Sequence, residues 1–279
     1  MTLLRSVLYT PGHDEAKIAK APNYGADALC LVLEDSVPVA LKARAREVTA
    51  EAIGTLSAGG QTVLVKVNPL EEGGLEDIAR IAQPGLAGVI VPKLREPAEV
   101  RHFDDALTGH DADLLLLIET PRAALQAFDL AESSPRVISL IAGTAANGDM
   151  ARELGFRWTA EGLERLHLRS KLLLDARAAG VEWPLDGIHP DVKDIDGLVA
   201  DAERARDLGY RGKLVVHPSH VEPVNRVFTP SADEVEQQRR VLAAFDDGTA
   251  AAVVNGRFVD IAMAKTARKI IELAESAAR

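Results

Sequence analysis

The sequence lacks several features that mark secreted, membrane-spanning and nucleic-acid-binding proteins. Its single cysteine, Cys30, lies in an apolar run, so we expect core packing and no disulfide within the chain. No apolar run approaches the roughly 18 residues of a membrane helix, and the first residues are too polar for a signal peptide. The formal net charge of −10 disfavours non-specific nucleic-acid binding, which needs a basic surface. We therefore expect a cytoplasmic protein that binds neither nucleic acid nor membranes.

Short apolar runs alternate with helical segments eight times along the chain. Hydrophobic residues make up 47% of the sequence, enough to bury a sizeable core. This alternation predicts parallel strands joined by helical crossovers, and eight such units fit a closed (β/α)₈ TIM barrel. An open doubly wound sheet is the alternative if the weak seventh run is not a strand. The expected strands are residues 7–10, 28–33, 62–68, 88–91, 114–118, 137–142, 185–188 and 213–216.

A different pattern begins after residue 230. Ser231 followed by Glu234 has the spacing of a helix capping box. Asn255-Gly256 between two apolar runs predicts a tight hairpin, and a final helix is expected over 261–277. The sequence therefore predicts a TIM-barrel catalytic domain, residues 1–230, and a C-terminal helical and hairpin extension, residues 231–279.

Several predicted strands end in carboxylates, and in such barrels the chemistry takes place at the carboxyl ends of the strands. The fifth run stops abruptly at Glu119, where an isolated carboxylate beside an apolar wall needs a partner. Asp149 follows the adjacent sixth strand in a loop that can bend inward at Gly148. Paired Cys or His side chains are missing from these ends, which disfavours zinc or copper. Two carboxylates suit Mg²⁺, so Glu119 and Asp149 are the predicted ligands of one magnesium ion.

Some of these polar residues also have a plainer structural explanation. Asp149 could cap the helix that follows it, and Glu34 and Asp35 could do the same after the second strand. His217, which precedes a proline, is expected to be a structural histidine. Lys66 is harder to explain in this way, because a lysine inside an apolar strand is seldom buried without a partner.

Six motifs occur along the chain: RSVLYTPG at 5–12, LEDSVP at 33–38, VPK at 91–93, IET at 118–120, LDG at 185–187 and HP at 217–218. In this order they resemble the citrate lyase beta subunit family. That group includes malyl-CoA and citramalyl-CoA lyases and falls within the HpcH/HpaI aldolase superfamily. The resemblance extends from residue 5 to residue 260 and implies a TIM barrel.

The resemblance implies a Mg²⁺-dependent carbon–carbon lyase. Such an enzyme cleaves a 3-hydroxyacyl thioester into an acyl-CoA and a keto acid such as oxaloacetate, glyoxylate or pyruvate, or runs the reverse condensation. Glu119 and Asp149 match the family's metal ligands, and Glu119 is also expected to lie against the bound substrate. Lys66 and Arg5 are expected to stabilise negative charge on the reacting species.

Three further residues complete the expected site. Glu34 and Asp35 are expected to contact the substrate. Asp260 falls where some family members carry a carboxylate that reaches a neighbouring subunit's site and acts in proton transfer. The resemblance therefore implies a homo-oligomer, a trimer or a hexamer, in which the C-terminal extension contacts a neighbouring subunit.

The sequence departs from the family pattern at three places. Lys66 stands where the family usually has Arg, which keeps the charge but loses the fork that grips a carboxylate in bidentate fashion. The loop at residues 143–149 is longer than usual, which favours a differently shaped pocket. Val32 stands where many members have Asp.

Three other functions remain open from the sequence. The first is a class II aldolase that cleaves free 2-keto-4-hydroxy acids without a thioester. The second is a citrate lyase beta subunit that works inside a larger complex on an acyl carrier protein. The third is a barrel that has lost catalysis and serves in binding, which the carboxylates Glu119, Asp149 and Asp260 make the weakest of the three.

Overall fold

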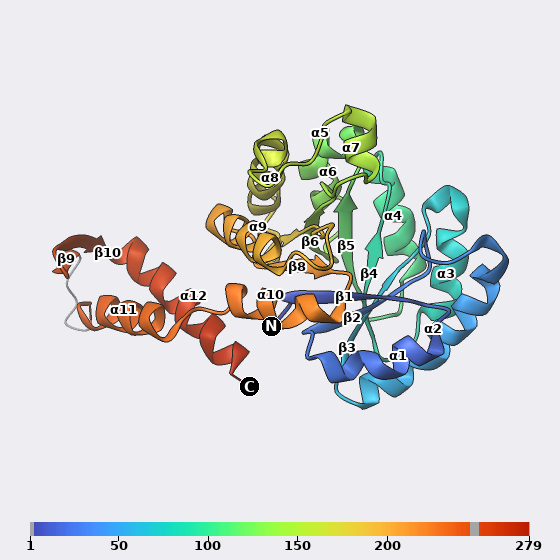
Figure 1. Ribbon diagram of the computed structural model, residues 1–279, viewed down its shortest axis with the longest axis horizontal. Coiled ribbons are helices and arrows are strands. Elements are labelled where there is room, and N and C mark those ends of the chain that lie inside the picture. Colours follow the sequence, from blue (N-terminus) through green and yellow to red (C-terminus); the bar gives the residue numbers. More distant parts are fainter. Residues whose placement is uncertain (1–2, 246–250, 279) are drawn as a thin grey trace. The chain divides into compact units, whose positions relative to one another are not determined.

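The computed structural model describes residues 3–245 and 251–278 (Figure 1). The chain divides into two compact units, and the division falls between Asn225 and Arg226, inside helix α10 (Val221–Phe228). None of the helices in the described part of the chain is long and apolar enough to cross a membrane.

The larger unit is a closed barrel of eight parallel strands, as the alternation of runs predicted. The strands pair in chain order, and β1 closes the barrel by pairing with β8. The predicted seventh strand exists but is only two residues long. The strands are β1 (Ser6–Pro11), β2 (Ala28–Val32), β3 (Thr62–Lys66), β4 (Leu86–Val91), β5 (Asp113–Ile118), β6 (Val137–Ala142), β7 (Leu185–Asp186) and β8 (Gly212–Val215).

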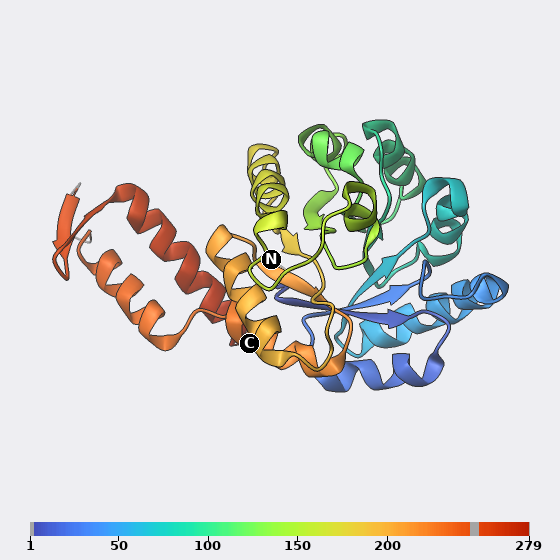
Figure 2. The ribbon, with the colours of Figure 1, turned by 45° about the horizontal axis from the view of Figure 1, so that its top comes forward.

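Helices surround the strands on the outside (Figure 2). Helix α1 ends at Lys20, where a 3-10 turn follows it directly, and α5 and α6 are separated by Gln126. Short 3-10 turns lie at Ala21–Tyr24, Val39–Leu41, Leu70–Glu72 and Pro218–His220. Besides α10, the barrel helices are α1 (Glu15–Lys20), α2 (Lys42–Ala58), α3 (Gly74–Ile81), α4 (Pro97–Ala106), α5 (Pro121–Leu125), α6 (Ala127–Glu132), α7 (Asp149–Leu154), α8 (Leu163–Ala178) and α9 (Ile195–Leu208).

The strands are buried on both faces, which explains their continuous apolar sequences. Leu114, Leu115, Leu116 and Ile118 of β5 are all fully buried. Each such side chain contributes roughly 1.5–3 kcal/mol by leaving water. Cys30 lies in this core as expected, and burial raises the pKa of its thiol to about 12, so it stays protonated and unreactive.

Charged side chains fill one buried region between the barrel and its helices. Asp201 of α9 accepts hydrogen bonds from Lys213 Nζ at 2.7 Å and from Arg169 Nη1 at 3.2 Å. Asp186 at the end of β7 also binds both Lys213 and Arg169. Burial alone would raise the pKa of Asp201, but Lys213, Arg169 and Arg165 outweigh it and hold that pKa well below its ordinary value.

Replacing Asp201 by Asn should destabilise the barrel strongly. The change leaves Lys213 and Arg169 in a buried region with one carboxylate fewer, a defect that costs about 3–5 kcal/mol. We expect the free energy of unfolding at pH 7, measured in urea, to fall by this amount. The control is Asp207→Asn, an exposed position on the same helix, which should change it by less than about 0.5 kcal/mol. Equal stabilities of the two variants would show that the network contributes nothing.

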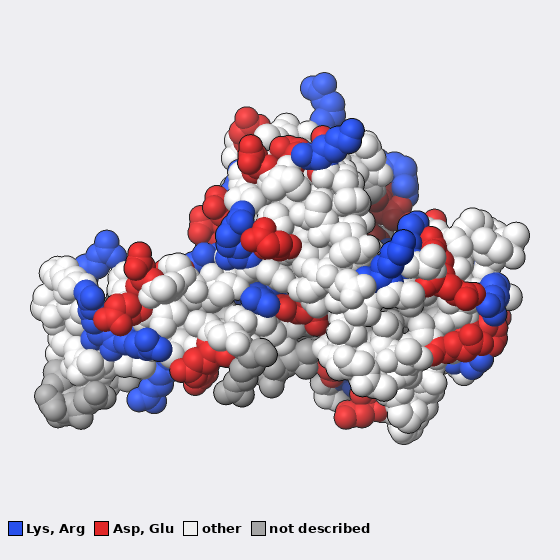
Figure 3. Space-filling view, turned by 60° about the horizontal axis from the view of Figure 1, so that its bottom comes forward, with Lys and Arg blue, Asp and Glu red and all other residues white. Residues whose placement is uncertain are grey.

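On the face shown in Figure 3, positive and negative side chains are interspersed. Arg80 and Glu47 form one exposed ion pair of the barrel, at 2.5 Å. Pairs of this kind contribute about 0–1 kcal/mol each, so the electrostatic part of the barrel's stability rests on the buried network.

The smaller unit contains two helices and a hairpin, and both of its sequence signals are confirmed. Ser231 and Glu234 form the capping box of α11 (Ala232–Ala243). The hairpin pairs β9 (Ala251–Val254) with β10 (Arg257–Asp260) in antiparallel fashion and leads into α12 (Ile261–Ala277).

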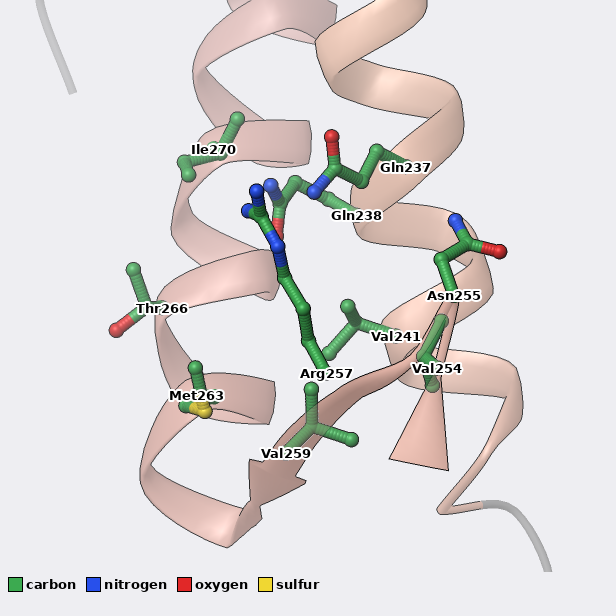
Figure 4. A pocket seen from close by; sticks show the side chains of 10 residues that line it. All are labelled: Gln237, Gln238, Val241, Val254, Asn255, Arg257, Val259, Met263, Thr266 and Ile270. Atoms are coloured by element: carbon green, nitrogen blue, oxygen red, sulfur yellow. The ribbon is translucent and has the colours of Figure 1, made fainter. Parts of the chain in front are cut away.

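A cavity of about 620 Å³ lies between α11, the hairpin and α12 (Figure 4). The Arg257 side chain extends from the hairpin into the space between the two helices, toward Gln238 (Figure 4). Val241, Val259 and Ala267 form the small buried core beside it.

Candidate active site

The predicted site residues gather at the carboxyl end of the barrel. Lys66 is the last residue of β3, and Glu119 follows β5 directly. Asp149 is the first residue of α7, in the connection after β6. Together with Asp35 and Tyr9, these side chains line one cavity of about 180 Å³. That volume is below the range of about 300–1,000 Å³ that drug-sized ligands occupy, so the cavity suits a small acid.

Glu34 is the buried partner that Lys66 was expected to have. Only 1% of Glu34 is exposed, and its carboxylate lies 2.5 Å from Lys66 Nζ and 2.9 Å from Lys93 Nζ. Burial would raise the pKa of Glu34, but the two ammonium groups lower it below its ordinary value. Burial would lower the pKa of Lys66, but Glu119 and Glu34 raise it. The three residues therefore form an ionised carboxylate held between two protonated lysines.

The loop that carries Glu34 is held by a second set of hydrogen bonds. Lys42 Nζ donates to the carbonyl oxygens of Leu33 at 2.7 Å and Glu34 at 2.8 Å, and to Asn68 Oδ1 at 2.6 Å. The Asn68 side chain donates to Asp77 at 2.7 Å, and Asp77 is fully buried. These charged and buried contacts fix the end of β2 relative to the end of β3.

Glu119 is 9% exposed and lies in an environment with too little positive charge. Burial raises the pKa of its carboxyl against the opposing effect of Lys66, and with the contribution of the neighbouring carboxylates of Glu34 and Asp149 that pKa is about 7. One carboxylate oxygen accepts a hydrogen bond from the backbone N–H of Lys93 at 3.1 Å. A cation placed beside this carboxylate would compensate for its burial.

Two backbone features bring these groups together. Lys93 has a φ of +53°, a left-handed conformation that is uncommon for a residue other than glycine. In this conformation its N–H binds Glu119 while its ammonium group binds Glu34. Gly143, after β6, has no room for a side chain, because an added Cβ would lie 2.5 Å from the Cβ of Glu119.

Asp149 completes the pair that was predicted to bind metal. Gly148 occupies the cap position of α7, so Asp149 is not its cap residue but lies in the first turn. Its carboxylate is paired with Arg152, an exposed residue three positions along the same helix. Asp149 and Glu119 line the same cavity.

The residues at this cavity fit a hard divalent cation. The available side-chain ligands are carboxylate oxygens, which Mg²⁺ prefers, and the raised pKa of Glu119 marks a shortage of positive charge. Within residues 3–245 and 251–278, no group of three or more His, Cys, Asp and Glu side chains is arranged to hold a metal. A cation held by Glu119 and Asp149 would take its other ligands from water and substrate, as Mg²⁺ commonly does.

Arg5 does not belong to this cluster, and the structure does not bring it to the other predicted site residues. It precedes β1, at the amino end of the barrel, where its carbonyl oxygen accepts from the N–H of Lys213 at 2.8 Å. Its guanidinium group binds the carboxylate of Asp27 at 2.7 and 2.9 Å, just before β2. The full length of β1 separates it from the carboxyl ends of the strands, farther than an arginine side chain extends.

Asp260 and His217 have local structural roles in the described chain. The Asp260 carboxylate caps α12 by accepting a hydrogen bond from the N–H of Met263 at 3.0 Å. His217 Nδ1 lies 2.8 Å from Ser219 Oγ at the start of a 3-10 turn. The capping bond does not test the predicted role of Asp260 at a neighbouring subunit's site, which stays a prediction.

A second cavity, of about 230 Å³, adjoins the first. It shares Tyr9, Asp35 and Lys66 with the first cavity and is also lined by Glu34 and Ser36. Tyr9 and Lys93 were not among the predicted site residues. An apolar strand such as 7–10 gave no reason to single out its tyrosine, and the role of Lys93 depends on its unusual backbone angle.

Comparison with known proteins gives consistent matches. The family described as HpcH/HpaI aldolase/citrate lyase matches residues 5–218. A protein of Cereibacter sphaeroides named (3S)-malyl-CoA thioesterase is 36% identical over 98% of this chain and 95% of that protein. The citrate lyase subunit beta of Haemophilus influenzae is 30% identical over 100% of this chain and 99% of that protein.

The fold also matches a solved structure over nearly its whole length. The CitE protein of Mycobacterium tuberculosis in complex with magnesium, acetoacetate and coenzyme A has a TM-score of 0.78 and 28% sequence identity. The match covers 97% of this chain and 98% of that chain.

Proposed function

The chain belongs to the HpcH/HpaI aldolase/citrate lyase family, a family of carbon–carbon lyases, and on that basis we propose a Mg²⁺-dependent cleavage of 3-hydroxyacyl thioesters. The products would be an acyl-CoA and a small keto acid such as glyoxylate, oxaloacetate or pyruvate, and the reverse condensation uses the same site. The observation that carries this proposal is the arrangement of Glu119 and Asp149 around one small cavity, beside the protonated Lys66.

Glu119 and Asp149 would hold the metal, which when bound acts as a Lewis acid on the oxygens of the keto acid. In the cleavage direction a base removes the proton of the 3-hydroxyl group, that oxygen becomes the keto oxygen, and the C2–C3 bond breaks. The bonding electrons pass into the thioester enolate, which is then protonated at C2. Lys66 is placed to stabilise negative charge on these species.

The protonation state of Lys66 decides between two chemistries. Lysines in barrels can also attack carbonyl groups as neutral amines and form Schiff bases, which requires a lowered pKa. The pKa of Lys66 is instead raised by Glu119 and Glu34. Lys66 therefore acts as a fixed cation, and the cleavage proceeds without an imine.

The proton at C2 needs a donor, and we assign it to Asp260 of a neighbouring subunit. The C-terminal extension would then contact that neighbour, so the active protein is a homo-oligomer. The capping bond of Asp260 to Met263 leaves one carboxylate oxygen available for this role.

Thioester cleavage and its metal dependence can be tested together. Purified protein should release keto acid from one or more of malyl-CoA, citramalyl-CoA and citryl-CoA, as followed with a phenylhydrazine assay. Removal of metal with EDTA should reduce the rate to background, and excess Mg²⁺ should restore it. A free 2-keto-4-hydroxy acid should not be cleaved. Cleavage of the free acid alone, or full activity in EDTA, would contradict the proposal.

Thioester hydrolysis is the second candidate, because a relative with 36% identity is named (3S)-malyl-CoA thioesterase. The two reactions differ in their products. Hydrolysis of malyl-CoA releases free coenzyme A and malate, whereas carbon–carbon cleavage releases glyoxylate and leaves the thioester intact. A thiol reagent detects only the first reaction, so a rate measured with it in the absence of keto acid favours the thioesterase.

The similarity to a citrate lyase beta subunit raises the question of which group carries the acyl chain. In this alternative, the acyl group of the substrate is attached to an acyl carrier protein and not to free coenzyme A. Turnover of a CoA thioester by the isolated chain would favour CoA, and turnover only with an acylated carrier protein would favour the complex.

A further inference from the structure

Tyr9 lies where the two cavities at the carboxyl end of the barrel meet. It belongs to β1 and lines both the cavity that contains Glu119 and Asp149 and the cavity that contains Glu34. Lys66 also lines both cavities, and its ammonium group lies 6.0 Å from the centre of the Tyr9 ring. Whatever spans the two cavities must therefore pass these two side chains.

The Tyr9 hydroxyl is buried, and within the described residues it has no hydrogen-bond partner. Burying a hydroxyl without a partner is unfavourable, so a ligand in these cavities that accepts a hydrogen bond from Tyr9 would remove this cost. Burial and the nearby carboxylates of Glu119 and Glu34 raise the pKa of Tyr9 well above its ordinary value. The phenol stays protonated and is available as a hydrogen-bond donor.

On the basis of the proposed lyase function, we propose that Tyr9 is a specificity-determining residue whose hydroxyl donates a hydrogen bond to an oxygen of the bound keto acid. Lys66, at the end of β3, supplies a positive charge. The Tyr9 hydroxyl, on β1, supplies an uncharged hydrogen-bond donor. The two donors together distinguish a 2-keto acid, with carbonyl and carboxylate oxygens on neighbouring carbons, from a simple carboxylic acid.

The chain has three tyrosines, and Phe variants of all three distinguish an effect on ligand binding from an effect on stability. Tyr9→Phe removes the unpartnered hydroxyl. Tyr210→Phe removes a buried hydroxyl that donates to the carbonyl oxygen of Arg169 at 2.8 Å, away from the site. Tyr24→Phe removes an exposed hydroxyl. All three changes delete one oxygen atom and keep the ring.

The test measures the Kd of pyruvate, glyoxylate and oxaloacetate by calorimetry in the presence of Mg²⁺, together with the Tm of each full-length variant. Tyr9→Phe should weaken keto-acid binding by about 10- to 100-fold, as expected for loss of a hydrogen bond to a charged acceptor. Its Tm should equal or exceed that of the wild type. Tyr210→Phe should lower the Tm and leave the Kd unchanged, and Tyr24→Phe should change neither.

An unchanged Kd in Tyr9→Phe overturns the assignment, as does a wild-type protein that binds none of the three keto acids with Mg²⁺. The result is independent of turnover. If Tyr9→Phe weakens keto-acid binding while the wild type cleaves no thioester, the assignment of Tyr9 stands and the proposed lyase reaction is what fails.

Discussion

Replacing Glu119 by Gln is expected to reduce Mg²⁺-dependent cleavage by on the order of 10³-fold or more, the loss typical when a preorganised charge-stabilising group leaves an active site. The amide keeps the shape of the side chain but cannot neutralise a cation. Keto-acid release in the thioester assay measures the effect. The exposed Glu132 on α6 provides the control, since Glu132→Gln makes the same chemical change far from the cavity and should leave the rate unchanged.

Glu119→Gln is expected to lower the rate, but when metal is absent it should not lower the stability of the folded protein. The pKa of Glu119 is about 7 in the folded protein, against 4.5 ordinarily. Between these pH values the folded state holds a proton that the unfolded state has released. The stability that Glu119 contributes is therefore present below about pH 4.5 and lost as the pH rises through 7.

Glutamine does not titrate, so in EDTA at pH 8 the Glu119→Gln protein should melt at the same temperature as the wild type or above it. Added Mg²⁺ should raise the Tm of the wild type only, because a ligand stabilises the state that binds it. A variant that retained both turnover and the Mg²⁺-dependent rise in Tm would show that Glu119 is not a metal ligand.

Replacing Lys66 by Met is expected to damage both catalysis and folding. The change removes the cation that we place beside the reacting oxygens, which should lower kcat/KM by about 10²- to 10³-fold. The buried Glu34 loses its ion pair with Lys66 and keeps the one with Lys93. Breaking a buried pair by removing one member costs about 3 kcal/mol in the free energy of unfolding.

A second substitution separates the two effects. In the Lys66→Met/Glu34→Gln double variant the uncompensated carboxylate is gone, so we expect most of the lost stability to return while turnover stays low. Lys171→Met, which breaks a partly exposed pair with Asp175 on α8, should cost less than about 1 kcal/mol and should not affect turnover. If the double variant regained wild-type turnover, Lys66 would be a structural residue only.

The fold could be predicted from the sequence because a simple pattern of apolar runs specifies it. Strands buried on both faces need continuous apolar runs, and eight such runs alternate with helices along the chain. The prediction was weakest where tertiary contacts decide the outcome. The seventh strand is only two residues long, between Pro184 and Gly187, and the helical segment after β5 is interrupted at Gln126, which is neither a proline nor a glycine.

The site could be predicted only in part. Glu119 and Asp149 were identified because a charge at the end of a buried strand needs a partner, and they do line one cavity. Arg5 was included because the resemblance begins with it, although it precedes the first expected strand, 7–10, and the structure places it beside Asp27 at the amino end of the barrel. Lys42 and Lys93 were not singled out, because no local pattern reveals their contacts: Lys42 donates to the carbonyl oxygens of Leu33 and Glu34, and the backbone N–H of Lys93 donates to the carboxylate of Glu119.

The most direct test of the metal assignment is a crystal structure of the protein soaked with Mn²⁺ and pyruvate, with data collected for the anomalous signal of manganese. We expect one strong anomalous peak within coordination distance of carboxylate oxygens of both Glu119 and Asp149, with pyruvate oxygens as further ligands. A peak elsewhere on the protein, or a cavity that binds pyruvate with no manganese beside these two carboxylates, would contradict the magnesium-dependent lyase.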